Sequence, residues 1–342
     1  MTVPSASSPR SERPVGLNLH SHLEGSVRPS TAAEIAAGLG VPAPTEGWDG
    51  ALRMHDAGNL TTFLARVAHA YPLFRSRGAM YRIVTEAVKD AARDGAVFLE
   101  LRFGPATHAG PALPLAAVVE AASEAVRDAA RMTGMPAGLV VCALRHHDAD
   151  TNREVARVAA AFAGRGVVGF DVAGDERLVP SLEPMRAPFA IAAAAGLGLT
   201  AHAAEAGPAS AVRDAVERLG VRRIGHGSRA AEDPELLKWA VDEGVCFEVC
   251  PTSNVLTGAA RSYAEHPVVA FVRAGCEVVV GDDDPTTTGA RLAREFELLG
   301  AAAGIGPEAV RRIHRTSIDR AFCDPSDRAA MGARAGSLVH GD

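Results

Sequence analysis

The stretch VGLNLHSHLEGSV, residues 15–27, decides the fold. It starts as an apolar run of the kind that forms a buried β-strand and becomes polar at His20, Ser21 and His22. In an open, doubly wound sheet the first strand normally leads into a glycine-rich turn that binds phosphate. This strand leads instead into a His-x-His pair followed by an acid, Glu24. The sequence therefore favours a closed parallel barrel over an open sheet.

Seven further apolar or β-branched runs follow along the chain, separated by segments with helical spacing. Strands that alternate with helices form parallel sheets, and eight such units close a (β/α)8, or TIM, barrel. We predict an α/β protein with one barrel domain at residues 15–322, a flexible segment at 1–14 and a weakly ordered tail at 323–342. The seven runs are residues 96–103, 137–144, 167–174, 197–205, 222–227, 245–251 and 276–282.

The interval from residue 29 to 95 is too long for one helix of the repeat. It predicts a helical insertion between strands one and two, above the C-terminal mouth where barrels build their active sites. Its aromatic side chains fit either core packing or a lid over a substrate. They are Trp48, Phe63, Tyr71 and Phe74.

Composition restricts the class of partner. The formal net charge is -6 and the sequence pI is about 6.1, which does not suit a nucleic-acid-binding surface. No apolar run reaches membrane-spanning length, and residues 1–14 lack the apolar core of a signal peptide. The five cysteines show no paired short spacing, as in a reduced protein. We expect a cytoplasmic protein with no nucleic-acid or membrane partner, and leave a homo-oligomer open.

Chemically unusual side chains end four of the predicted strands. His20 and His22 lie two residues apart, so both point to the same face of an extended strand. Singly, these residues fit ordinary buried histidines or an acidic surface turn. In a barrel, however, all strand ends meet at one mouth, and three imidazoles with one carboxylate suit a catalytic zinc. The residues are His20, His22, His202, Glu205, His226 and the triplet Asp282, Asp283 and Asp284.

Seven motifs in this order resemble the adenosine and adenine deaminase branch of the amidohydrolase superfamily. The resemblance covers about residues 15 to 320 and implies a hydrolase that replaces the amino group of a 6-aminopurine with an oxo group. It also implies one zinc ion per chain as cofactor. The motifs are HSHLEG (20–25), ELRFGP (100–105), DVAGDE (171–176), HAAEAG (202–207), RIGHG (223–227), CPTSN (250–254) and DDDP (282–285).

The resemblance also implies a role for each matching residue. A carboxyl group that protonates a ring nitrogen must hold its proton near neutral pH, so its pKa should be raised by burial or by nearby negative charge. The implied metal ligands are His20, His22, His202 and Asp283. Of the other residues, Glu205 is implied to donate a proton to N1 of the purine, and His226 to orient or deprotonate the attacking water. Asp284 is implied to accept a hydrogen bond from the N7 side, and the Gly174 backbone to contact N3.

The sequence departs from the family pattern at three positions. Ala204 stands where the family usually has glycine, which crowds the turn before Glu205. Asp282 adds a charge beside the paired acids, so a register with Asp282 as the ligand stays open. Glu24 stands where adenosine-specific members carry Asp, which suggests a free base or a nucleoside altered at its 5' side, such as aminodeoxyfutalosine. Alternatively, Glu24 pairs with Arg28 or Arg102.

Lysine usage predicts a single metal. Lys89 and Lys238 are the chain's two lysines, and both fall in helical segments. The carboxylated lysine that bridges two metals in binuclear relatives would need to lie at a strand end. Three functions remain as hypotheses. The first is deamination of adenosine, of a 5'-modified adenosine derivative or of adenine. The second is hydrolysis of a cyclic amide or ester, and the third is a binding role for a zinc-stabilised scaffold.

Overall fold

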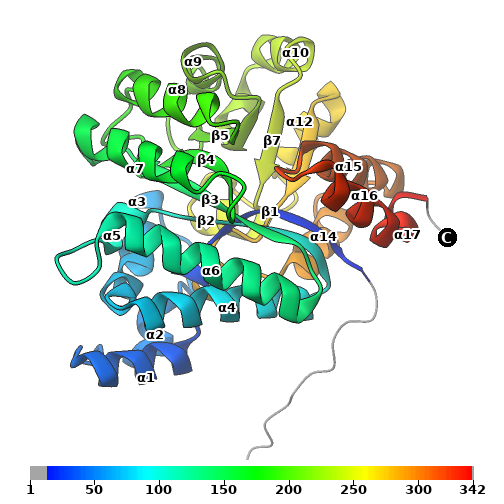
Figure 1. Cartoon of the computed structure of the whole chain (residues 1–342). Coiled ribbons are helices and arrows are strands. Elements are labelled where there is room, and N and C mark those ends of the chain that lie inside the picture. Colours follow the sequence, from blue (N-terminus) through cyan, green and yellow to red (C-terminus); the bar gives the residue numbers. More distant parts are fainter. Residues whose placement is uncertain (1–13, 341–342) are drawn as a thin grey trace, which may run out of the picture.

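The computed structural model describes residues 14–340. Within them, eight parallel strands lie side by side in chain order and curve into a barrel surrounded by helices (Figure 1). This confirms the predicted (β/α)8 fold. The strands are β1 Gly16–His22, β2 Ala96–Phe103, β3 Ala137–Leu144, β4 Val167–Ala173, β5 Gly198–Ala203, β6 Arg223–His226, β7 Cys246–Val249 and β8 Glu277–Val280.

A short seam joins β8 to β1. Ser21 and Asp283 form a single parallel bridge. The Asp283 N–H donates to the His20 carbonyl at 2.9 Å, and the His22 N–H donates to the Asp283 carbonyl at 2.5 Å. The acidic loop, residues 282–284, is therefore hydrogen-bonded directly to the strand that carries His20 and His22.

The outer helices bury small and branched side chains against the strands. On α6, for example, Val118, Val119, Ala122 and Val126 are fully buried. Their spacing of three to four residues places them on one face of the helix. The helices of the barrel are α5 Pro105–His108, α6 Leu115–Thr133, α7 Ala149–Ala161, α8 Arg186–Ala194, α9 Ala211–Leu219, α10 Pro234–Asp242, α11 Pro251–Leu256, α12 Val268–Ala274, α13 Pro285–Thr288, α14 Leu292–Ala301 and α15 Pro307–Arg320, with the short 3-10 turns η3 Glu183–Met185 and η4 Ser228–Glu232.

The segment between β1 and β2 forms the predicted helical insertion. Trp48 and Phe74 are buried in the main core, whereas Phe63 and Tyr71 line the cavity at the barrel mouth. Core packing is therefore confirmed for Trp48 and Phe74, while the lid role remains a prediction for Phe63 and Tyr71. The elements are η1 Glu24–Ser26, α1 Pro29–Leu39, α2 Gly47–Leu52, α3 Leu60–Val67, η2 Ala68–Phe74 and α4 Arg77–Arg93.

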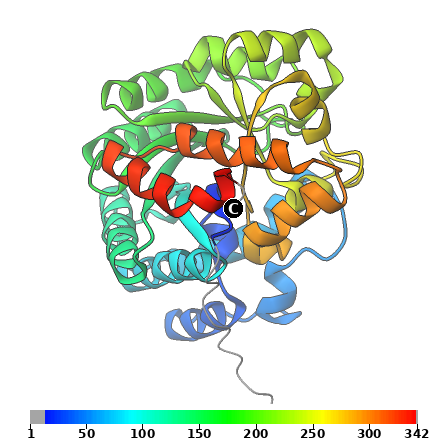
Figure 2. The same ribbon diagram turned by 90° about the vertical axis from the view of Figure 1, so that its right-hand side faces the viewer.

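The C-terminal stretch corrects one expectation. In place of a weakly ordered tail, residues 325–340 form α16 Pro325–Arg334 and α17 Gly336–His340, which lie beside α15 (Figure 2). Met331 and Ala335 are fully buried in a cluster with Leu17 and Phe98. The few apolar residues of this stretch lie on one small face, which the surrounding polar residues made hard to recognise in the sequence. The flexible segment expected at 1–14 falls, apart from Pro14, outside the described residues.

No helix in the described part of the chain is long and apolar enough to cross a membrane. Lys89 lies in α4 and Lys238 in α10, as their surrounding sequence predicts.

Candidate active site

Four predicted ligand residues meet at the C-terminal mouth. The His20 and His22 Nε2 atoms each lie 3.4 Å from Asp283 Oδ1, and the Nε2 atoms of His22 and His202 are 3.2 Å apart. Ligand atoms bound tetrahedrally to zinc, about 2.0–2.2 Å away, are separated by about 3.4 Å. These three pairs of atoms therefore have the spacing of neighbouring ligands around one such ion.

The protonation of the imidazoles also suits a cation. Burial holds the pKa of His22 well below its usual value, so the ring is neutral and keeps a lone pair. His20 is fully buried, with its Nδ1 2.7 Å from a Glu248 oxygen, while its Nε2 has no hydrogen-bond partner. An Nδ1–H donated to Glu248 leaves the Nε2 lone pair directed at the cluster, as in metal-binding histidines.

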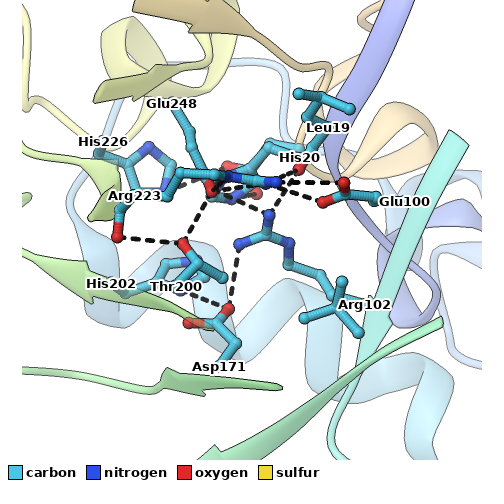
Figure 3. Close-up of polar contacts among 12 residues, drawn as sticks. Leu19, His20, Glu100, Arg102, Asp171, Thr200, His202, Arg223, His226 and Glu248 are labelled. Atoms are coloured by element: carbon cyan, nitrogen blue, oxygen red, sulfur yellow. Dashed lines mark hydrogen bonds and ion pairs between the residues drawn. The ribbon is translucent and has the colours of Figure 1, made fainter. Parts of the chain in front are cut away.

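Buried charges below the cluster hold these rings in place (Figure 3). Arg102 lies 2.9 Å from Glu248 and 3.0 Å from Asp171. Asp171 also lies 3.0 Å from His202 Nδ1. Burial opposes ionisation of Glu248, but the neighbouring arginines hold its pKa well below its usual value. Sequence reasoning missed these positioning residues, although Glu100, Arg102 and Asp171 stand in the quoted motifs.

Glu248 is the centre of this network. Its second oxygen accepts from Thr200 Oγ1 and from Arg223 Nε, both at 2.7 Å. Arg223 in turn pairs with Glu100 at 2.8 Å. A single glutamate in β7 thereby joins the His20 imidazole to two buried arginines.

Backbone strain is concentrated at the same strand ends. In the described residues, the non-glycine positions with positive φ are Ala204 (56°), His226 (60°) and Asp283 (60°). Residues with a Cβ rarely adopt this conformation, and it tends to persist where the surroundings enforce it at functional sites. Ala204 replaces the family's usual glycine at a position where glycine would be unstrained.

Asp282 points away from the ligand cluster. It lines a separate polar cavity with Arg28, Asp94 and Arg291, and burial raises its pKa to about 7. Asp283 supplies the oxygen that faces His20 and His22. The geometry therefore favours the register with Asp283 at the cluster.

Two other side chains come close to the cluster. His226 and Cys250 each form, with His20, a set of potential ligand atoms within 4.8 Å of one another. Burial raises the pKa of the Cys250 thiol well above its usual value, which disfavours the thiolate that binds metals. The His226 Nε2 atom lies 4.0 Å from Asp283 Oδ2 and 3.8 Å from Glu205 Oε2, between the cluster and the cavity.

Glu205 and Asp284 both hold protons more tightly than ordinary acids. Burial, with the negative charge of Asp283, raises the pKa of Glu205 to about 8. Burial and Asp283 also raise the pKa of Asp284 well above its usual value. Both groups line the cavity, and each can donate a proton or a hydrogen bond at neutral pH.

The comparisons with known proteins agree with this geometry. A family model described as "Adenosine deaminase" matches residues 16–334. This chain belongs to the adenosine deaminase family. It is 35% identical over 323 residues to an adenine deaminase of Mesorhizobium japonicum, covering 94% of this chain and 98% of that protein.

Two other similarities bear on substrate and metal. The chain is 32% identical over 311 residues to an adenosine deaminase of Clostridium perfringens, covering 90% of this chain and 93% of the other. A solved amidohydrolase from Burkhoderia ambifaria, with bound zinc, matches with a TM-score of 0.84 and 26% identity over 96% of this chain and 93% of that one. As a member of the adenosine deaminase family, the chain is a hydrolase of C–N bonds in cyclic amidines.

The candidate active site opens into a cavity of about 310 Å³. Leu60, Phe63 and Tyr71 of the insertion form an apolar wall, and Gly174, with φ 111°, lies at the end of β4. Thr61 Oγ1 donates to Asp175 at 2.6 Å, which fastens α3 to the loop after β4. Apolar walls with a few convergent polar groups are typical of sites for flat aromatic ligands.

Glu24 lies in this cavity but pairs with neither Arg28 nor Arg102. One of its oxygens accepts from the Gly104 N–H at 3.0 Å and lies 2.9 Å from His108 Nε2. Arg28 pairs with Asp90 instead. His108 was not singled out from the sequence, because it lies outside the quoted motifs.

Glu176 holds the loop that carries Glu205. Its two carboxylate oxygens accept from the backbone N–H groups of Ala204, Ala206 and Gly207 at 2.9, 2.6 and 2.8 Å. Three amide donors to one buried carboxylate fix the loop around the strained Ala204. Glu176 ends the motif DVAGDE, so the sequence contained the residue without indicating its role.

Proposed function

We propose that this enzyme is a zinc-dependent deaminase of a 6-aminopurine, converting it to the 6-oxo product with release of ammonia. The observation that carries the proposal is the meeting of four ligand atoms with two raised-pKa acids, Glu205 and Asp284, at one cavity. A binding scaffold would need the ligands but would not need buried acids that remain protonated.

His20, His22, His202 and Asp283 would hold one zinc ion. When bound, zinc lowers the pKa of a coordinated water to about 7, which supplies a nucleophile at neutral pH. The absence of a lysine from the strand ends supports a mononuclear site, since Lys89 and Lys238 lie in outer helices.

The protein side chains would handle the purine. Glu205, held protonated, donates to N1 while the water oxygen bonds to C6. One proton of the water passes to the amino nitrogen and the other returns to the Glu205 carboxylate, as the C6–N bond breaks and ammonia is released. Asp284, also protonated, donates to N7, which is an acceptor; this reverses the hydrogen-bond direction expected from sequence. Gly174, which carries no side chain, leaves its backbone open to N3.

Charge in the cavity argues for a substrate without phosphate. Of the described residues that line it, Arg145 is the one arginine, and no lysine lines it. Arg145 donates to the carbonyls of Val179, Pro180 and His202, so its charge faces protein rather than ligand. The acids Glu24 and Asp175 would repel a phosphate. We propose a nucleoside, either adenosine or a 5'-modified derivative such as aminodeoxyfutalosine.

Free adenine is a second candidate, favoured by Glu24. One of its oxygens is already bonded to Gly104 and His108, which weakens it as a partner for a ribose hydroxyl. The similarity to an adenine deaminase supports the same reading.

A substrate screen on zinc-loaded protein tests the proposal. Adenosine, aminodeoxyfutalosine, adenine and AMP would be followed by the ultraviolet change of deamination and by ammonia release. We expect turnover of at least one of the first three and none of AMP. The Glu205→Gln variant should bind zinc yet lose several orders of magnitude in kcat, on the scale of removing a general acid.

Two results would count against the proposal. Ammonia from none of the aminopurines, together with hydrolysis of a cyclic amide or ester, would assign the site to the related amidohydrolase reaction. Zinc retention by His22→Ala at wild-type affinity would contradict the ligand set.

A further inference from the structure

A chain of three buried hydrogen bonds runs from the start of α12 to His226. The Val268 backbone N–H donates to His266 Nδ1 at 3.1 Å. His266 Nε2 lies 3.1 Å from Asn254 Oδ1, and Asn254 Nδ2 lies 3.0 Å from His226 Nδ1. His226, Asn254, His266 and Val268 are all buried, so water does not compete for these groups.

The backbone amide sets the direction of the whole chain. It can only donate, so His266 Nδ1 must accept and cannot carry a proton. The single proton of His266 is then on Nε2 and is donated to the Asn254 carbonyl oxygen. Turning the Asn254 amide over would set its NH₂ group against the His266 N–H, with two donors facing each other. Asn254 must therefore donate to His226 Nδ1.

We infer that Asn254 and His266 are positioning residues that hold His226 in one tautomer, with its proton on Nε2. This inference rests on the proposed function, because it concerns how His226 meets the attacking water. With Nδ1 occupied by a donor, His226 has no free lone pair and acts as a hydrogen-bond donor. Of the two roles expected for His226, orientation of the water is then the one that it performs.

The proton released by the water must consequently go elsewhere. Asp283 Oδ2, 4.0 Å from His226 Nε2, is a carboxylate oxygen that can accept it. The water oxygen, held by the His226 N–H, is free to bond to C6. Proton acceptance and water orientation are thus assigned to different side chains.

Nitrogen NMR of the zinc-loaded protein tests the tautomer without using activity. With ¹⁵N-labelled histidine, His226 should show a protonated Nε2 and an unprotonated Nδ1, its signals being identified by their loss in His226→Gln. In Asn254→Asp a carboxylate replaces the donor, so His226 should gain a proton on Nδ1. His266→Phe, which removes the group that orients Asn254, should leave a mixture of tautomers.

Kinetics give the second readout. Asn254→Asp should lower kcat by about 10²-fold or more, the usual scale for a misplaced acid–base group, with a much smaller change in KM. The matched control is His314→Phe: His314 is equally buried, stacks on Phe296 at 4.5 Å and lies in α15, outside the site. It should leave both kcat and the His226 signals unchanged.

The outcomes separate this inference from the proposed function. A proton on His226 Nδ1 in the wild-type protein, or an unaltered tautomer in Asn254→Asp, overturns the inference even if aminopurines are deaminated. If the NMR result is as expected but no aminopurine reacts, the proposed function fails while the hydrogen-bond chain stands.

Discussion

Glu205 is the side chain whose protonation state the reaction depends on most directly. It is buried beside Asp283, and its pKa is raised to about 8. Because the proposed reaction uses the protonated form, activity should be present below this pKa and should be lost as the pH rises through it. A bound cation favours the carboxylate and moves this limit to lower pH.

We therefore predict that kcat/KM falls about tenfold per pH unit on an alkaline limb that begins at or below about pH 8. The measurement is a pH–rate profile of the zinc-loaded enzyme. The residual activity of Glu205→Gln should lack this limb. A wild-type rate that rises steadily up to about pH 10 would rule out an essential Glu205 proton.

Glu248 is the residue on which both stability and ligand geometry depend. It is fully buried and contacts His20, Arg102 and Arg223. Since its pKa is held well below the usual value, its stabilising effect is present above the unfolded-state pKa and is lost as the pH falls through the folded-state pKa.

Replacing Glu248 by Gln should lower the free energy of unfolding by about 3–5 kcal/mol, because two buried arginines lose a partner. Zinc affinity should fall about 10–100-fold, since His20 loses the group that orients it. Chemical denaturation and metal titration measure the two effects. Glu232→Gln, at an exposed surface pair, is the control; equal losses in both variants would show that Glu248 has no special role.

At this scale the sequence indicated the proposed ligands better than the groups that contact them. His20, His22, His202 and Asp283 stand out because they interrupt apolar runs at strand ends. Glu248, in contrast, lies inside a strand, where its partners come from four other strands and leave no local pattern. Its role follows only from the closed barrel.

At the scale of the elements, the seam between β8 and β1 brings the acidic loop against the first strand. A Cβ on Gly281 would lie 2.3 Å from the His20 carbonyl oxygen and 2.5 Å from the His20 Cβ. Both atoms belong to His20, a proposed metal ligand, so they cannot move without displacing that side chain. Only glycine fits this approach.

Gly281→Ala should accordingly lower zinc affinity by on the order of tenfold or more and destabilise the fold. Isothermal titration with zinc and thermal unfolding provide the measurements. Gly78→Ala, in α4, is the matched control because nothing lies within 4 Å of its added methyl group. Wild-type zinc affinity in Gly281→Ala would mean that the backbone between β8 and β1 can shift to fit a methyl group without displacing His20.

Strand positions were predicted well where apolar runs are long. They were predicted poorly where tertiary contacts determine the ends of an element. The runs 96–103 and 137–144 coincide with β2 and β3. The run 197–205 ends beyond β5, because Ala204 already turns with a positive φ. Residues 325–340 were expected to be weakly ordered because their apolar side chains are few, yet those few are buried beneath the barrel.

For the whole molecule, the C-terminal helices complete the core at the N-terminal end of the barrel. Arg223 lies 4.0 Å from the Phe322 ring centroid, and the Phe322 N–H donates to Glu100 at 2.6 Å. Met331 is fully buried against the same end. The tail is therefore part of the folded domain.

Met331→Ala should lower the free energy of unfolding by about 2–5 kcal/mol, the usual cost of a cavity in a core. Met132→Ala is the control, because Met132 is 56% exposed and its replacement should change stability by no more than about 0.5 kcal/mol. Urea unfolding compares the two. Equal stability of both variants would show that the tail packs only loosely.

The bridge between Ser21 and Asp283 also sets an order of events during synthesis. The ribosome makes the first two proposed imidazole ligands near residue 20 and the proposed carboxylate ligand more than 260 positions later. A growing chain can therefore offer histidines to a passing ion but cannot complete the coordination sphere. If these residues bind the proposed zinc ion, full metal binding must follow synthesis of the last strand, and tight zinc uptake would indicate that the barrel has finished folding.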